Sequence, residues 1–166
     1  MPIREDILRF SDGSIAPWYV RLVGAVGCLF AMTEDDRVIL VRQYKHGAGR
    51  VVTELPTGMV ERGESPKTGA IRELREETGY AIAPSRVKKI STTLLSATGE
   101  SGERHLFFGR GAVRVGVPMS NPHEATTVVL VSLAEALRYA RNGIIAEGGQ
   151  IGMVYAALDH IGFLKQ

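Results

Sequence analysis

The chain has 166 residues, of which 45% are hydrophobic and 23% charged, and this ordinary composition for a globular protein excludes extensive disorder. Its formal net charge of +2 is too small to indicate a nucleic-acid-binding surface. The single cysteine, Cys28, excludes an intramolecular disulfide, and we expect it to be a small buried side chain. The apolar run at residues 22–32 is too short to span a bilayer, and the N-terminus does not have the pattern of a signal peptide. We therefore expect one cytoplasmic domain over residues 1–166, with neither a membrane nor a nucleic acid as a partner.

Predicted strands dominate the first half of the chain. Residues 1–17 look like a short N-terminal lead-in. Residues 18–32 and 37–45 are rich in apolar and β-branched side chains, and the acidic turn between them predicts a hairpin. A further strand is predicted within residues 50–60, where a proline and a glycine break the pattern near its end.

The first helix is predicted between Ser65 and Gly79. Ser65 suits the N-cap, the proline that follows it suits the first helical position, and Gly79 suits the C-cap. Two more strands are expected at residues 86–95 and 104–115.

The last third of the chain predicts one strand and two helices. The strand at residues 125–133 runs into a helix that begins with a capping box formed by Ser132 and Glu135. Apolar residues then recur at helical spacing over residues 150–163. Because only one strand–helix–strand unit is clear, we expect an α/β fold with a mixed sheet covered by helices.

Three glutamates gather on one side of the predicted helix. At about 100° per residue, Glu73, Glu76 and Glu77 lie within roughly 100° of one another, away from the apolar side. Glu73 and Glu77 form a like-charge pair that destabilises an isolated helix by a few tenths of a kcal/mol. Convergent carboxylates are typical ligands of Mg²⁺, but acidic helix faces are also common on protein surfaces. The helix alone therefore fits both a cation site and a solvated face.

The spacing around this helix is more specific. The pattern G-x5-E-x7-R-E-U-x-E-E-x-G-U, in which U is a bulky apolar residue, is met by Gly58, Glu64, Arg72, Glu73, Leu74, Glu76, Glu77, Gly79 and Tyr80. It resembles the signature box of the Nudix hydrolases. This resemblance implies a mixed sheet sandwiched between helices (α/β/α) and hydrolysis of a nucleoside diphosphate linked to another group. It also implies Mg²⁺ as the cofactor, with Mn²⁺ as an alternative.

The resemblance assigns metal-binding roles within the box. Glu73 and Glu77 are expected to be the principal metal ligands, and Glu76 is expected to share the site and to take part in catalysis. The backbone carbonyl of Thr57 matches a further ligand position.

The remaining box residues are expected to be structural. Glu64 and Arg72 match residues that usually pair and brace the loop against the helix, although Glu64 could instead be a surface carboxylate. Gly58 and Gly79 are the two glycines of the box.

The approach to the box narrows the resemblance to ADP-ribose pyrophosphatases and their nucleotide-sugar relatives. Their pattern is roughly R-Q-Y-R, a gap, and E-L-P-A-G. This chain has "RQYK" and "ELPTG", so Thr57 replaces the usual alanine. The resemblance implies that Arg42, Gln43 and Glu54 bind substrate, but these residues could also simply brace the strand.

A glycine-rich loop at residues 96–103 is expected to supply the catalytic base. In the same subfamily a glutamate in a P-G-x-[ST]-x-E loop orients the attacking water. Glu103 fits that position, although Thr98 stands where the proline is expected, and Glu100 is the second candidate. Both glutamates could also be ordinary loop acids.

The sequence as a whole indicates a Mg²⁺-dependent, homodimeric enzyme that hydrolyses a small-molecule nucleoside diphosphate sugar resembling ADP-ribose. The alternatives are a Nudix hydrolase of nucleoside triphosphates or dinucleoside polyphosphates, and a non-catalytic Nudix ligand-binding domain. Two features depart from the ADP-ribose enzymes. Leu94 and Leu95 stand where those enzymes usually have a proline, and only about 20 residues precede the first core strand, where the enzymes have a longer segment that forms a small sheet.

Overall fold

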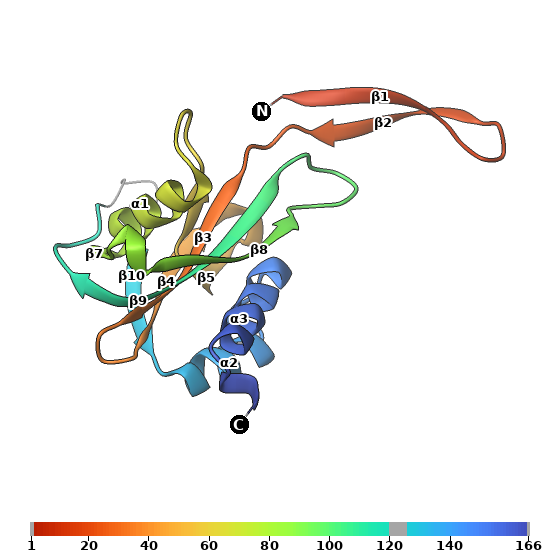
Figure 1. Ribbon diagram of the computed structural model, residues 1–166. Helices are drawn as coiled ribbons and strands as arrows, with labels where there is room; N and C mark the ends of the chain where they lie inside the picture. Colours follow the sequence, from red (N-terminus) through yellow and green to blue (C-terminus); the bar gives the residue numbers. More distant parts are fainter. Residues whose placement is uncertain (1, 120–125, 166) are drawn as a thin grey trace.

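A mixed eight-stranded sheet forms the centre of the protein in a computed structural model that describes residues 2–119 and 126–165 (Figure 1). Its main path runs through β10 (Thr126–Val131), β4 (Val38–Lys45), β3 (Val26–Thr33), β9 (Glu103–Arg114) and β7 (Tyr80–Ala81). Three further strands pair with this path: β5 (Arg50–Glu54) with β4, β6 (Thr57–Met59) with β3, and β8 (Val87–Leu94) with β9. The pair β3–β9 is parallel and the others are antiparallel, which confirms the predicted mixed sheet.

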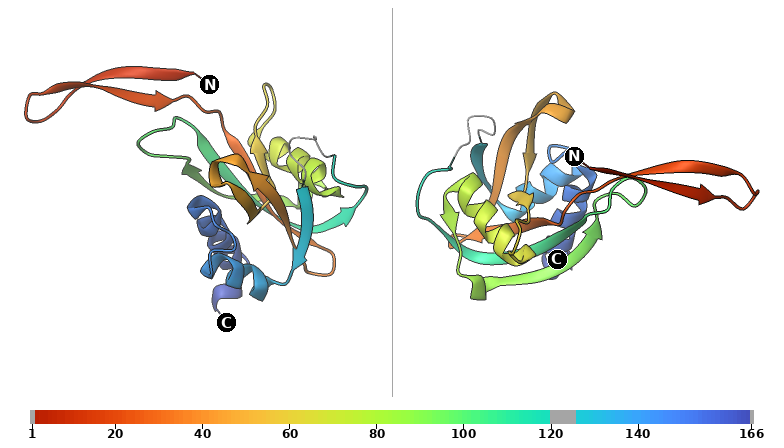
Figure 2. Two further views of the ribbon diagram at one scale, coloured as in Figure 1. Left: turned by 180° about the vertical axis from the view of Figure 1, so that it is seen from behind. Right: turned by 90° about the horizontal axis from the view of Figure 1, so that it is seen from above.

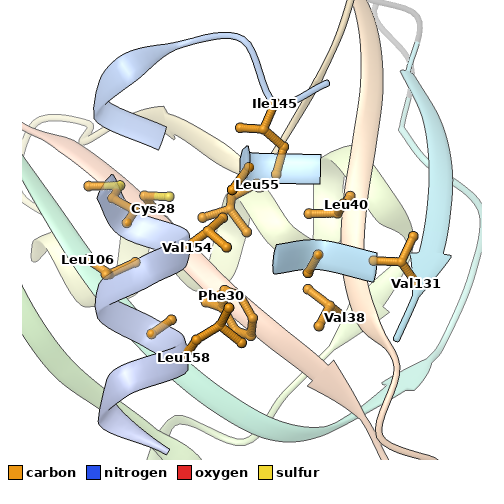
Figure 3. Close-up of a cluster of buried hydrophobic side chains, with 14 of the residues drawn as sticks. Cys28, Phe30, Val38, Leu40, Leu55, Leu106, Val131, Ile145, Val154 and Leu158 are labelled. Atoms are coloured by element: carbon orange, nitrogen blue, oxygen red, sulfur yellow. The ribbon is translucent and has the colours of Figure 1, made fainter. Parts of the chain in front are cut away.

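Helices cover both faces of the sheet, as the sequence predicted (Figure 2). Helix α1 (Pro66–Thr78) lies on one face, where Ala70 and Leu74 pack among side chains of β3, β4 and β9. Helices α2 (Leu133–Arg141) and α3 (Gly148–His160) lie on the other face. There Val154 and Leu158 pack against Phe30 and Cys28 is fully buried, as Figure 3 shows.

The helix ends follow the predicted capping chemistry. The Ser65 hydroxyl accepts the N–H of Thr68 at 3.1 Å, and Gly79 ends α1 with a left-handed φ of 72°. The capping box of α2 is present, with Ser132 and Glu135 each bonded to the other's backbone. Helix α3 begins two residues before the expected position, and residue 125, the predicted start of the late strand, lies outside the described part of the chain.

The N-terminal segment differs from its prediction. Residues 1–17 were expected to be a lead-in to one long strand, but β1 (Ile3–Arg9) and β2 (Ile15–Arg21) pair as a separate two-stranded antiparallel sheet. The single run over residues 18–32 is thus wrong, because residues 22–25 separate β2 from β3. Residues 22–25 are themselves apolar or glycine, so their composition does not distinguish the break from the strands on either side. The short segment nevertheless makes a small sheet, and it projects from the body as an arm (Figures 1 and 2).

None of the helices described over residues 2–119 and 126–165 is both long enough and apolar enough to cross a membrane.

Candidate active site

Arg72 of α1 organises the loop that precedes the helix. Its Nη2 lies 2.8 Å from Glu64 Oε1 and donates to the carbonyl of Met59 at 2.9 Å. Glu64 Oε1 also accepts the N–H of Glu61 at 2.7 Å. The hydrogen bonds from Arg72 and from this N–H hold the pKa of Glu64 below its usual value. The pair therefore ties both ends of the loop to the helix.

The same guanidinium also holds two of the glutamates that the sequence assigned to metal. Its Nη1 lies 2.8 Å from Glu73 Oε1 and 3.0 Å from Glu76 Oε2. In this arrangement, no three acidic, histidine or cysteine side chains within the described residues converge closely enough to enclose a metal ion. Each carboxylate meets Arg72 Nη1 through one oxygen, and an ionised carboxylate has two acceptor oxygens.

Glu77 has the environment of a cation ligand. Its carboxylate is largely buried, and Oε2 accepts the N–H of Thr57 at 3.0 Å. The pKa of Glu77 is raised to about 8, chiefly by burial, against the lowering effect of the bond from Thr57. The nearby charges of Glu73 and Glu54 contribute to the increase, and the charge of Lys45 opposes it. A divalent cation would relieve both the burial and the repulsion, so the residues present fit a metal ion bound through oxygen.

This environment predicts a pH-dependent stability for the metal-free protein. Glu77 binds a proton more tightly in the folded state than in the unfolded state, so its protonation stabilises the fold. This stabilisation is fully present below the unfolded pKa of about 4.5 and is lost as the pH rises through about 8. We expect the free energy of unfolding to fall across this window by at most about 1.4 kcal/mol per pH unit from this residue. Burial also raises the pKa of Glu54, which acts in the same direction. Urea unfolding in a chelator from pH 5 to 8.5 measures the slope. If the free energy of unfolding changed with pH in the same way in the wild type and in Glu77→Gln, the raised pKa would not belong to Glu77.

Gly58 allows Glu73 to lie directly against the strand. Gly58 of β6 pairs with Gly27 of β3, and α1 crosses over both. A Cβ atom at Gly58 would overlap the carboxyl group of Glu73. A Cβ at Gly27 would come within 2.7 Å of the Pro66 carbonyl oxygen. Gly58 therefore leaves the space that the Glu73 carboxyl group occupies.

A cavity of about 530 Å³ opens beside the box. Its walls include the box residue Gly58, Thr57 directly before it, side chains of β3 to β6, and the start of α3. Apolar side chains supply much of the lining, including Val26, Val52 and Met59. A cavity of this size with a few polar groups is typical of a small-molecule site.

Two ion pairs line the cavity, and sequence reasoning identified only one of their four members. Glu54 was predicted, and it lies 2.5 Å from Lys45 Nζ. Arg104 of β9 lies 2.7 Å from Glu147, which precedes α3. Lys45 stands at the last position of "RQYK", where the related pattern has arginine, and that position could have identified it. Arg104 and Glu147 are 43 residues apart in sequence and carry no local motif.

The other two predicted substrate-binding residues lie elsewhere. Arg42 is exposed on β4, opposite Thr127 and Thr53 in the ladder, whereas Gln43 is buried and 6% exposed. Neither lines the cavity, so Glu54 is the member of the predicted trio that the fold brings to it.

The two candidate bases have different neighbours. Glu100 forms an ion pair with Arg21, and the backbones of these two residues also form a bridge, so Glu100 ties the loop to the N-terminal arm. Glu103 is more exposed and lies 3.6 Å from His105 Nε2. Because side chains alternate along a strand, Glu103 shares the face of His105 and Phe107, which is the face that α1 covers. His105 and Gly58 both pair with Gly27, so two strand spacings, roughly 10 Å, separate them.

Comparison with known proteins agrees with this architecture. The fold is similar to a solved structure described as an ADP compounds hydrolase, with a TM-score of 0.83 at 19% identity over 97% of this chain and 88% of the other. The sequence is 34% identical over 158 residues to an ADP-ribose pyrophosphatase of Mycobacterium tuberculosis, covering 93% of this chain and 74% of that protein. It is 29% identical over 123 residues to a methanol dehydrogenase activator of Bacillus methanolicus, covering 74% of this chain and 65% of the relative, which is less than two thirds of its length. The NUDIX domain model matches residues 21–147, which include the whole box helix and both candidate bases, and the chain therefore belongs to the Nudix family.

Proposed function

We propose that this chain hydrolyses the pyrophosphate bond of a nucleoside diphosphate sugar resembling ADP-ribose, giving a nucleoside monophosphate and a sugar phosphate. One observation carries the proposal: the cavity beside the box is bounded by Thr57 and Gly58, which contact Glu77 and adjoin Glu73. A substrate in this cavity would have its phosphates next to the acidic side chains. The names of the pyrophosphatase relative and of the solved structure agree with this substrate class.

The donor set supports Mg²⁺ as the cation. Glu73, Glu76, Glu77 and the carbonyl of Thr57 would hold it, and all four supply the hard oxygen ligands that Mg²⁺ prefers. A bound cation would neutralise the negative charge of the pyrophosphate.

The protein's own groups would orient the two halves of the substrate. Lys45 and Arg104 are cations inside the cavity, each already positioned by an acidic partner, and they suit the phosphates and sugar hydroxyls. The apolar wall of Val26, Val52 and Met59 suits the flat face of a base or sugar. Water adds across the P–O–P bridge: its oxygen bonds to one phosphorus, and the bridging oxygen leaves with the other phosphate.

A product assay tests the proposal. The protein is incubated with ADP-ribose, GDP-mannose, UDP-glucose, NADH and dATP in Mg²⁺, and the products are identified. A nucleoside monophosphate and a sugar phosphate are expected. Release of pyrophosphate from dATP alone would favour the nucleoside triphosphate alternative. Absence of turnover with every substrate, with Glu77→Gln behaving like the wild type, would favour the non-catalytic alternative.

Glu103 is the proposed base, and its replacement should be the more damaging of two matched changes. Glu103→Gln is expected to lower kcat by about 10²-fold or more, because a positioned base typically contributes that much. Glu100→Gln should have a smaller effect on kcat and should mainly loosen the loop from Arg21. Steady-state kinetics with both variants measure the difference. If kcat fell further in Glu100→Gln than in Glu103→Gln, Glu100 would be the catalytic base.

A homodimer is also proposed, and the arm supports it. Its strands β1 and β2 expose Ile3, Ile7 and Ile15, which are 66%, 64% and 57% accessible. Apolar side chains gathered on an exposed segment are typical of an interaction surface. Light scattering of the full chain measures the mass, which should be that of two copies. The cytoplasmic location stays a prediction.

A further inference from the structure

A buried glutamine connects α3 to the turn that leads into the box. Gln150 lies in the first turn of α3 and is only 1% exposed. Its Oε1 accepts the N–H of Leu55 at 2.8 Å, and its Nε2 donates to the hydroxyl of Thr57 at 3.1 Å. Both ends of one side-chain amide are therefore bonded to residues 55–57, the turn after β5 and the first residue of β6.

The Thr57 hydroxyl completes this network. While it accepts from Gln150, it donates to the carbonyl of Leu55 at 2.8 Å, so its proton and a lone pair are both used. The backbone N–H of the same residue donates to Glu77 Oε2 at 3.0 Å. Thr57 thus links Gln150, from the helix on one face of the sheet, to Glu77, from the helix on the other.

The two side chains depend on each other. With the alanine that the related E-L-P-A-G pattern has at this position, Gln150 Nε2 would lose this partner in a fully buried place. A buried donor without a partner is strongly unfavourable. Thr57 and Gln150 therefore form a pair that the usual pattern does not provide for.

We propose that Gln150 and the Thr57 hydroxyl form a positioning pair for the metal-binding turn. The inference rests on the proposed function. The pair fixes the backbone of residues 55–57, which carries both the N–H bonded to Glu77 and the proposed carbonyl ligand. Neither side chain needs to touch the reacting atoms, since each acts through the backbone of the turn.

Mn²⁺ binding without substrate tests the pair. Gln150→Met keeps the length of the side chain but removes both hydrogen bonds, and Thr57→Val keeps the branched shape but removes the hydroxyl. Each change is expected to weaken Mn²⁺ binding by about 10- to 100-fold, as losses around metal ligands typically do. Electron paramagnetic resonance of free Mn²⁺ measures the dissociation constant. Thr57→Ser retains the hydroxyl, so its Mn²⁺ affinity should fall less than that of Thr57→Val.

A double-variant cycle and a matched control separate positioning from general stability. Because both changes break the bond between Gln150 and Thr57, the loss of Mn²⁺ affinity in the double variant should be smaller than the sum of the two single losses. Leu158→Val lies eight residues further along α3, is fully buried, and should lower Tm without changing Mn²⁺ affinity. In the metal-free protein, the amide NMR signal of Thr57 should shift in Gln150→Met if the turn moves.

The proposal is overturned if Gln150→Met lowers Tm like Leu158→Val and leaves Mn²⁺ affinity and the Thr57 amide signal unchanged. It is also overturned if the effects of the two single changes on Mn²⁺ affinity simply add. Failure of the proposed function is distinguishable, because a wild type that binds Mn²⁺ but turns over no pyrophosphate substrate leaves the metal-binding comparison intact.

Discussion

Glu77→Gln is expected to lower kcat/KM for ADP-ribose by on the order of 10³-fold, a loss comparable to removal of a principal electrostatic group in an active site. Gln has the same size, and its amide oxygen can still accept the N–H of Thr57. The change therefore removes the charge and leaves most of the packing. Steady-state kinetics at saturating Mg²⁺ measure the loss.

The same variant should be more stable than the wild type in the absence of metal above pH 8. Burial disfavours the charged form of Glu77, and Gln carries no charge at any pH. Lost activity together with gained stability cannot come from unfolding. Glu61→Gln is the matched control, because its carboxylate is 70% exposed in the preceding loop. If Glu77→Gln kept activity within a few-fold of Glu61→Gln, the metal-binding assignment would be wrong.

Local chemistry explains why the helices and the box were predictable. Ser65, Pro66 and Gly79 each act on the backbone within a few residues of themselves, so their meaning does not depend on the rest of the fold. The spacing from Gly58 to Gly79 likewise fixes which glutamates share one side of α1. The partners of Arg72 also lie within this stretch.

The cavity could not be predicted in the same way, since its walls come from distant parts of the chain. Gln150 bonds to Leu55 across 95 sequence positions, and Arg104 meets Glu147 only because β9 and the start of α3 lie together. Each of these side chains is unremarkable in its own sequence context. The separate sheet of the arm was missed for a related reason, because pairing partners rather than composition distinguish β2 from β3.

Gly58→Ala is expected to lower kcat by roughly 10²-fold, because misplacement of a catalytic group by about 1 Å can have that effect. The added Cβ would overlap the Glu73 carboxyl group, so either Glu73 or the β6 backbone must move. A small-to-large change in a packed place also destabilises a protein by about 1–3 kcal/mol. Kinetics and thermal unfolding of the same preparation measure both effects, and the fold should remain intact.

Gly152→Ala gives the matched comparison, since a Cβ there meets nothing within 4 Å and the residue lies inside α3. It should raise stability by about 0.5–1 kcal/mol, because alanine favours a helix over glycine. Its activity should match that of the wild type. If Gly58→Ala kept full activity, the overlap would have been relieved without moving Glu73 from its working position. Gly58 would then matter only for the packing of β6. A loss of activity in Gly58→Ala but not in Gly152→Ala would instead show that Gly58 is needed for the position of the Glu73 carboxylate.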